Sequence, residues 1–185
     1  KPANLVGASL GGMTSLSLAG DPDYSSLCKT LTMVDIGIYP NQDGSDRIVE
    51  FMRSAQNGFS SLEEAADYIS DFLPHREKPK DLSGLHKNLR KKDDRFYWHW
   101  DPKFLQGRQG QDIKEYFGHL EEAANFLNIP TLLIRGGLSD VLTEEDKDYF
   151  LKVVSHAEFE EISNAAHMVA CLLYTSDAAD DSACV

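Results

Sequence analysis

The sequence has little of several features that mark large classes of protein. Its three cysteines, Cys28, Cys171 and Cys184, form no C-x-x-C pair and have no metal-ligand spacing. An odd number without such spacing argues against a disulfide scaffold or a structural zinc site, and it fits a reducing compartment. No apolar run approaches the length of about 18 residues that a membrane-spanning helix needs. We therefore expect a protein of the cytoplasm, of bacterial origin.

Basic residues are also in short supply. Lys and Arg number 18 against 30 Asp and Glu, which gives a net charge of −12 over 185 residues. Nucleic acids and anionic membranes attract basic surfaces, so neither is expected as a partner. The chain also lacks the G-x-G-x-x-G order and the phosphate-loop lysine of nucleotide-binding folds, which argues against a Rossmann-type nucleotide binder. The oligomeric state cannot be inferred from this composition.

Apolar segments that alternate between strand and helix patterns are present at both ends of the chain. Their order predicts an α/β fold with a parallel sheet. The expected strands cover residues 3–8, 31–36, 131–134 and 157–162, and the expected helices cover residues 10–19 and 144–154.

The middle of the chain interrupts this alternation with amphipathic helical patterns. We expect residues 44–128 to form a helical cap, or lid, inserted between core segments 1–43 and 129–170. Within this cap, the charged run at residues 87–94 is interpreted as the solvated end of a helix.

A G-x-S-x-G motif, Gly7-Ala8-Ser9-Leu10-Gly11, lies where the first strand passes into the first helix. Such a turn is so tight that side chains two residues to either side of the serine should collide with the backbone. It presents the serine hydroxyl above the sheet, at the positive end of the helix. The backbone N–H of Leu10 is then the natural first donor to an oxyanion.

A serine hydroxyl becomes a nucleophile only beside a base that a third group orients. Asp140 follows the third expected strand, and His167 follows the fourth. Ligands gather at the carboxyl ends of strands in open α/β sheets. Serine, acid and histidine thus occur at three strand ends in one order, which favours a catalytic triad over separate structural roles.

On these motifs, residues 1–170 resemble the α/β-hydrolase superfamily, especially its esterase, lactonase and cofactor-free haloperoxidase-like branch with a helical cap. The resemblance implies Ser9 as nucleophile, Asp140 as acid and His167 as general base. Asp35, at the end of the second strand, is the alternative acid because some members of the family place it there. It is otherwise expected to orient the loop that enters the cap.

The resemblance implies a serine hydrolase that cleaves a small carboxylic ester, thioester or lactone through an acyl-enzyme. No cofactor or metal is implied, because the triad generates its own nucleophile. Hydrolysis of a carbon–carbon bond and perhydrolysis use the same triad and stay open as alternatives. A non-catalytic binding protein on the same scaffold is the alternative from another class.

Both ends of the chain look unlike those of a natural protein. The chain begins at Lys1, just before a strand, and residues 171–180 resemble a translated sequencing adapter, so residues 171–185 are expected to be a non-native tail. The family takes its second oxyanion donor from an N-terminal loop that this chain lacks. We therefore expect the chain as given to be nearly inactive, and its full-length parent to be an enzyme.

Four aromatic residues gather between residues 96 and 100, inside the expected cap. Trp98 and Trp100 could line a substrate pocket. The alternative interpretation is that they fix the cap to the body of the protein. The histidines outside the motif have no carboxylate or cysteine partners at metal-ligand spacing and are interpreted as surface or cap residues.

Overall fold

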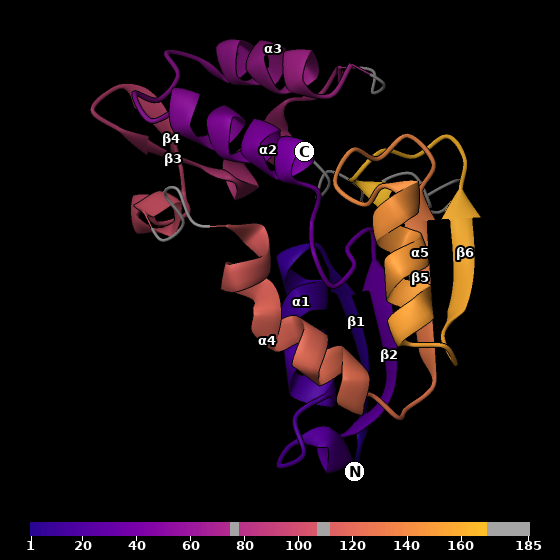
Figure 1. Ribbon diagram of the computed structural model, residues 1–185. Helices are drawn as coiled ribbons and strands as arrows, with labels where there is room; N and C mark the ends of the chain where they lie inside the picture. Colours follow the sequence, from indigo (N-terminus) through magenta and orange to yellow (C-terminus); the bar gives the residue numbers. More distant parts are fainter. Residues whose placement is uncertain (75–77, 107–111, 170–185) are drawn as a thin grey trace. The chain divides into compact units, whose positions relative to one another are not determined.

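Four parallel strands form the main sheet in a computed structural model that describes residues 1–74, 78–106 and 112–169. The strands are β1 (Ala3–Ala8), β2 (Cys28–Val34), β5 (Thr131–Gly136) and β6 (Glu158–Ile162). They lie in the order β1-β2-β5-β6, and every neighbouring pair is parallel (Figure 1). The predicted α/β class is confirmed. The expected tail, with Cys171 and Cys184, lies outside the described residues.

The chain divides into two compact units. The first contains residues 1–45 and the described residues from 112 onward, and so it holds the whole parallel sheet. The second contains residues 46–74 and 78–106. Helix α2 (Gln42–Ser54) begins in the first unit and continues without a break into the second.

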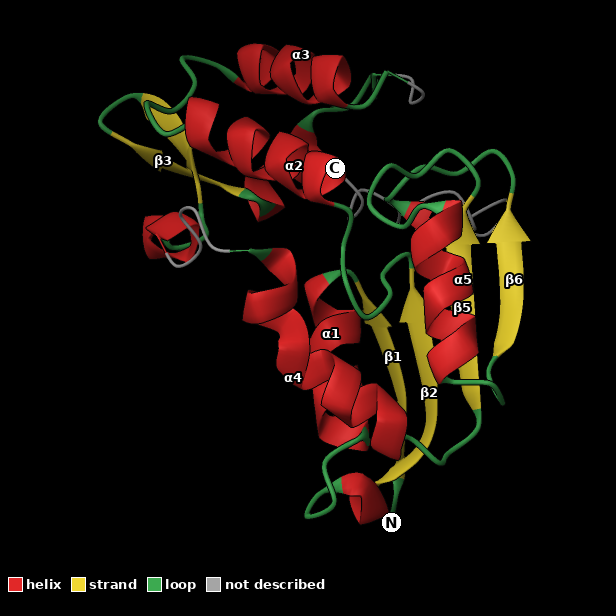
Figure 2. Cartoon of the chain, viewed as in Figure 1, coloured by secondary structure: helices red, strands yellow, loops and turns green. Residues whose placement is uncertain are grey.

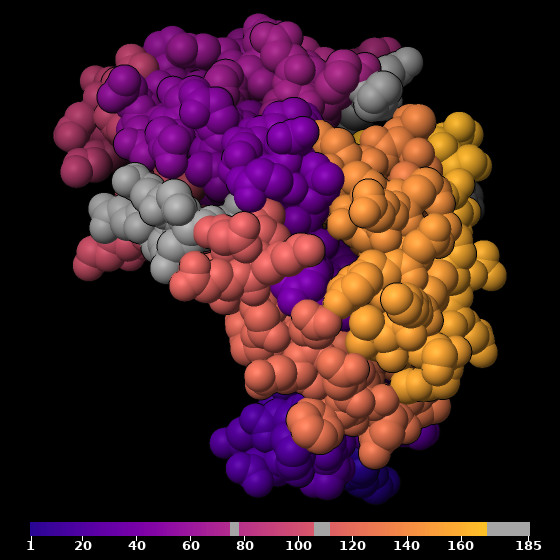
Figure 3. Space-filling view, viewed as in Figure 1, coloured from indigo at the N-terminus to yellow at the C-terminus, as the bar shows by residue number. Residues whose placement is uncertain are grey.

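Three helices pack on one face of the sheet in the first unit: α1 (Leu10–Ala19), α4 (Ile113–Phe126) and α5 (Glu144–Val153) (Figure 2). In the space-filling view, α4 and α5 form much of the surface on this side (Figure 3). Side chains of the central strands that point to this face are buried, among them Leu31, Met33 and Leu133. On the opposite face of the edge strand β1, Val6 is 73% exposed. One core of this unit therefore lies between the sheet and its helices, and a smaller apolar cluster is formed by Val34, Ala165 and Val169.

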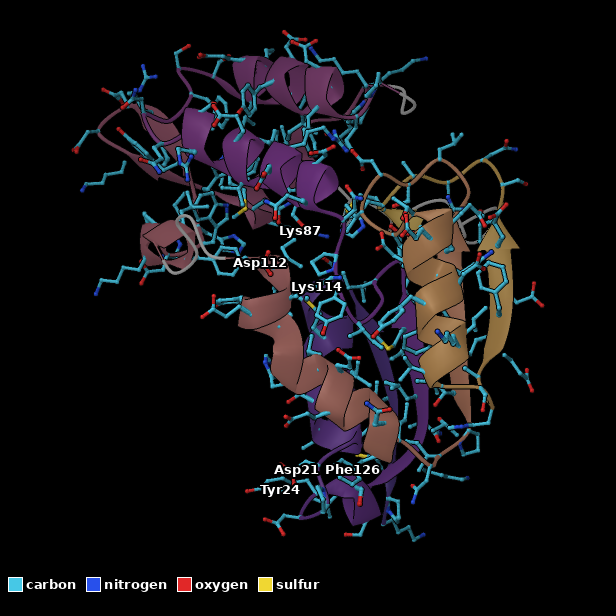
Figure 4. All side chains as sticks on the ribbon, in the orientation of Figure 1. Asp21, Tyr24, Lys87, Asp112, Lys114 and Phe126 are labelled. Atoms are coloured by element: carbon cyan, nitrogen blue, oxygen red, sulfur yellow. The ribbon has the colours of Figure 1, made fainter. Side chains whose placement is uncertain are left out.

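Capping side chains fix where these helices begin. Thr143 and Asp146 form the predicted reciprocal capping box at the start of α5. At the start of α4, the carboxylate of Asp112 accepts hydrogen bonds from the N–H groups of Lys114 and Glu115 (Figure 4). These oxygens satisfy amides that have no partner within their own helix.

Glu121 connects three separate parts of the first unit. Its carboxylate on α4 accepts a hydrogen bond of 2.5 Å from the Tyr39 hydroxyl and another from the Tyr149 hydroxyl on α5. The hydrogen bonds from Tyr149 and Tyr39 lower the pKa of Glu121, whereas burial and the nearby carboxylate raise the pKa of Tyr39. The loop after β2 is thereby fastened to two helices.

The second unit contains helices and a hairpin. Besides most of α2, it holds helix α3 (Leu62–Phe72) and the antiparallel strands β3 (Leu89–Lys92) and β4 (Arg95–Trp98). Its apolar residues form a separate core, made of Ala55, Phe59, Ala65, Ala66, Leu85 and Leu89. Three short 3-10 helices complete the two units, at Ser25–Leu27, Ser83–Lys87 and Pro102–Gln106.

The interpretation of residues 87–94 as a helix end was wrong. Most of this charged run belongs to the hairpin, because Asp93 and Asp94 both have positive φ angles, of 50° and 60°, and form its two-residue turn. Helix α4, which falls inside the expected cap range of 44–128, is grouped with the unit that carries the sheet. In the parts of the chain that the structure describes, no helix is both long enough and apolar enough to cross a membrane.

The contact between α1 and α4 yields a test of this packing. A Cβ atom on Gly20 would lie 2.1 Å from the carbonyl oxygen of Ala123, whereas one on Gly118 would meet no atom within 4 Å. We predict that Gly20→Ala lowers the free energy of unfolding by about 1–3 kcal/mol. The matched control Gly118→Ala should raise it by up to about 1 kcal/mol, because alanine favours a helix. Urea denaturation of both variants measures the difference, and equal unfolding midpoints would contradict the packing.

Candidate active site

Ser9 lies in a strained turn between β1 and α1. Its φ and ψ are 50° and −122°, a conformation that non-glycine residues rarely adopt. The backbone N–H of Ser9 donates to the carbonyl of Val34 at 3.1 Å, and the Ser9 carbonyl accepts from Gly12 and Met13. Hydrogen bonds to β2 and to the first turn of α1 thus hold the strained residue in place.

Glycine is required on one side of this turn. A Cβ on Gly7 would lie 2.3 Å from the carbonyl oxygen of Gly11, and one on Gly12 would lie 2.5 Å from a methyl group of Ile36. A Cβ on Gly11 would meet nothing within 4 Å. The collision expected on both sides of the serine therefore exists at the first glycine of the motif and not at the last.

The turn places the Ser9 hydroxyl beside the imidazole of His167. The distance from Ser9 Oγ to His167 Nε2 is 3.0 Å, and the distance from His167 Nδ1 to Asp35 Oδ2 is 2.7 Å. The histidine side chain is 13% exposed, and the aspartate side chain is fully buried. Serine, histidine and carboxylate thus form one continuous chain of hydrogen bonds, the arrangement that activates a serine hydroxyl.

The carboxylate of Asp35 is surrounded by donors from the last residue of β5 and from the loop that follows it. Its Oδ1 atom accepts the N–H of Gly136 at 2.7 Å, and its Oδ2 atom lies 2.5 Å from the hydroxyl of Ser139. The backbone of Asp35 has a φ of 53°, which turns the chain sharply at the end of β2. Each buried carboxylate oxygen therefore has at least one partner, as burial of a charge requires.

The acid in this geometry differs from the one that we expected. Asp140 was the preferred acid and Asp35 the alternative, but the hydrogen bond from the histidine goes to Asp35. The physical reason is the position of β2 between β1 and β5, which brings the turn at Asp35 next to the serine strand. Asp140 lies one residue beyond Ser139, and its backbone packs against Gly44 of α2, where a Cβ would lie 2.2 Å from the Asp140 carbonyl oxygen.

Sequence reasoning missed the residues that hold Asp35. Gly136 and Ser139 lie in the segment Arg135-Gly136-Gly137-Leu138-Ser139, directly before the aspartate that the sequence indicated as the acid. A serine that comes soon after a strand and a glycine pair is a common turn residue, so the sequence contains no signal that separates this role from an ordinary turn.

Arg135, the residue before Gly136 in β5, binds the loop that carries Ser139. Its buried guanidinium donates to the carbonyl of Leu142 at 2.8 Å and contacts the carboxylates of Glu144 and Glu161 at 2.6 and 2.5 Å. The hydrogen bond from Lys147 and the charge of Arg135 lower the pKa of Glu144. The loop that carries Ser139 is thus anchored by a charge that is itself paired.

Leu10 lies in the first unit, and the two tryptophans of the sequence analysis lie in the second. Leu10 is the first residue of α1, directly after Ser9, where a helix leaves its N–H groups without intrahelical partners. Trp98 packs against the core of the second unit, with ring centroids 5.9 Å from Phe51 and 5.6 Å from Phe59. Trp100 is half-buried.

The first unit contains other titratable residues, but they do not form a metal site. Among residues 1–74, 78–106 and 112–169, no group of three or more His, Cys, Asp and Glu side chains is placed to hold a metal ion.

The two glycines of the motif provide a matched pair of variants. We predict that Gly7→Ala destabilises the protein by about 1–3 kcal/mol or more, because the new methyl group overlaps the backbone of Gly11. Gly11→Ala should leave the stability unchanged or slightly higher, since the methyl group enters open space on a helix. Thermal and urea unfolding measure both. A Gly11→Ala protein as unstable as Gly7→Ala would contradict this account of the turn.

Comparison with known proteins gives several similarities. The family model of the alpha/beta hydrolase fold matches residues 1–171. The chain is 28% identical over 149 residues to the esterase Rv0045c of Mycobacterium tuberculosis, over 77% of this chain and 46% of the esterase. The chain thus spans about half the length of this curated relative.

Solved structures show the same fold. The crystal structure of E-2-(acetamidomethylene)succinate hydrolase matches with a TM-score of 0.74 and 17% identity, over 91% of this chain and 60% of that one. A crystal structure of the M. tuberculosis esterase Rv0045c matches with a TM-score of 0.62 and 25% identity, over 92% and 60%. With the family model matching nearly the whole described chain, we conclude that this protein belongs to the alpha/beta hydrolase fold family.

Proposed function

We propose that this chain carries the catalytic centre of a serine hydrolase that cleaves a small carboxylic ester, thioester or lactone. The observation that carries the proposal is the continuous chain from Ser9 through His167 to Asp35, with distances of 3.0 and 2.7 Å. The similarity to a protein named as an esterase supports the same class of reaction.

In the first step, Ser9 Oγ attacks the carbonyl carbon of the substrate, and its proton passes to His167 Nε2. The carbonyl electron pair moves to its oxygen, and the N–H of Leu10 donates a hydrogen bond to the oxyanion. Asp35 accepts a hydrogen bond from Nδ1 and stabilises the imidazolium that forms. The buried position of Asp35 strengthens this electrostatic effect, because little water screens it.

In the second step, the tetrahedral intermediate collapses and its leaving oxygen or sulfur takes the proton from His167 Nε2. The acyl group now forms an ester with Ser9. Water attacks this ester while His167 Nε2 accepts a proton from it, and a second tetrahedral intermediate forms. When this intermediate collapses, the proton passes from Nε2 to Ser9 Oγ, which restores the hydroxyl and releases the carboxylic acid. Trp98 and Trp100 stay candidates for contacts with the substrate, and the substrate itself is the partner that we propose.

A fluorophosphonate probe tests the nucleophile. We predict that the probe labels Ser9, because the neighbouring imidazole takes up the proton of its hydroxyl. The Ser9→Ala variant should not be labelled, and Ser15→Ala, on the same helix, should be labelled like the wild type. The reaction is followed by intact-mass spectrometry. Equal labelling of wild type and Ser9→Ala, or no labelling of either, would reject the enzyme in favour of a binding protein.

The two candidate acids can be compared directly. We predict that Asp35→Asn lowers kcat for a p-nitrophenyl ester by roughly 10³–10⁴-fold, because an amide cannot stabilise the imidazolium as a carboxylate does. Asp140→Asn should lower it by less than about tenfold, since the histidine bonds to Asp35. Steady-state rates of the two variants and the wild type measure both effects. The opposite ranking would return the catalytic role to Asp140.

A further inference from the structure

We propose that Ser139 is a positioning residue that holds the carboxylate of Asp35 in the orientation in which it accepts a hydrogen bond from His167. The inference rests on the triad proposed above and adds to it a residue that does not contact the substrate. Ser139 follows β5 in a loop of the first unit, and it is 9% exposed.

The partners of Ser139 Oγ determine where its proton points. This oxygen accepts the backbone N–H of Val141 at 3.1 Å and that of Leu142 at 3.3 Å. A hydroxyl has two acceptor lone pairs and one proton. With two amides on the lone pairs, the proton remains for the third partner, Asp35 Oδ2, at 2.5 Å. Ser139 is therefore a donor to the carboxylate and not an acceptor from it.

The carboxylate of Asp35 is oriented by donors on both of its oxygens. Its Oδ1 atom accepts the N–H of Gly136, and its Oδ2 atom accepts the hydroxyl of Ser139, so the carboxylate has donors on both oxygens. Oδ2 then also accepts from His167 Nδ1, which places the imidazole proton on Nδ1. The other nitrogen, Nε2, is left with a free lone pair 3.0 Å from Ser9 Oγ. A lone pair in this place is what a general base needs.

The loop that holds Ser139 is well anchored. The N–H of Ser139 donates to the carbonyl of Gly136 at 2.9 Å, and the guanidinium of Arg135 donates to the carbonyl of Leu142 at 2.8 Å. The two amides that point at Ser139 Oγ are thus held by backbone that is itself bonded. A serine that only stabilised this turn would accept hydrogen bonds from the two amides and would make no contact with Asp35. The structural role and the positioning role can therefore be separated by experiment.

Kinetics of three variants make this separation. Ser139→Ala removes the donor to Asp35, and Ser139→Thr keeps the hydroxyl. Thr143→Ala, the matched control, loosens the neighbouring start of α5 without touching Asp35. We predict that Ser139→Ala lowers kcat by roughly 10- to 100-fold with KM within about twofold, the loss expected for one hydrogen bond to a charged group. Ser139→Thr should retain most of the wild-type kcat, and Thr143→Ala should leave kcat unchanged.

The pH dependence gives a readout that a purely structural role would not change. Loss of the Ser139 hydroxyl changes the hydrogen bonds at Oδ2, the atom that faces the imidazole, so the acidic limb of the kcat/KM profile should move. Thr143→Ala should leave this limb in place. A Ser139→Ala enzyme with an unmoved limb, or with a loss no larger than that of Thr143→Ala, would overturn the proposal while leaving the triad intact.

Nitrogen-15 NMR of the imidazole tests the same inference without turnover. The wild type should show the proton of neutral His167 on Nδ1 and a bare Nε2, and Ser139→Ala should shift the Nδ1–H resonance or mix the two tautomers. A wild type with its proton on Nε2, or an unchanged spectrum in Ser139→Ala, overturns the role of Ser139 whether or not the protein hydrolyses esters. If the fluorophosphonate probe does not label Ser9 in the wild type, by contrast, the proposed function is overturned.

Discussion

The buried carboxylate of Asp35 is the constraint on which the rest of the site depends. A charge removed from water is tolerated only where donors replace the solvent, and here the N–H of Gly136 and the side chains of Ser139 and His167 do so. These donors come from the loops after β5 and β6. The acid therefore gathers the ends of three neighbouring strands around one point.

The second requirement is close packing at the serine. The contact of Gly7 with the backbone of Gly11 and that of Gly12 with Ile36 leave no room for a Cβ, so helix α1 leaves the sheet at a fixed and very sharp angle. The same contact holds the hydroxyl of Ser9 at the positive end of the helix, where negative charge is stabilised. Backbone geometry and electrostatics thus favour the same position for the reacting oxygen.

The sequence was sufficient for the elements with strong local patterns. The strand before Ser9, the serine turn and the capping box at Thr143 were all predicted from residue type and spacing, and the structure contains each of them. The acid could not be chosen in this way, because Asp35 and Asp140 both follow apolar strands, and strand order, which decides between them, is not a local property. The hairpin in the second unit was missed for a different reason. Its turn is formed by Asp93 and Asp94, and without a glycine it gives only a weak turn signal. The expected cytoplasmic location and bacterial origin stay predictions.

The segment after Asp35 is restrained along its length within the first unit. Tyr39 donates to Glu121, the N–H of Asn41 donates to the carbonyl of Val141, and the side chain of Asn41 caps the start of α2. Few backbone torsions between Asp35 and Asn41 are therefore left to relax. A residue inserted or deleted in this segment would shift the turn that carries the acid, because no loose loop is there to absorb the change in length.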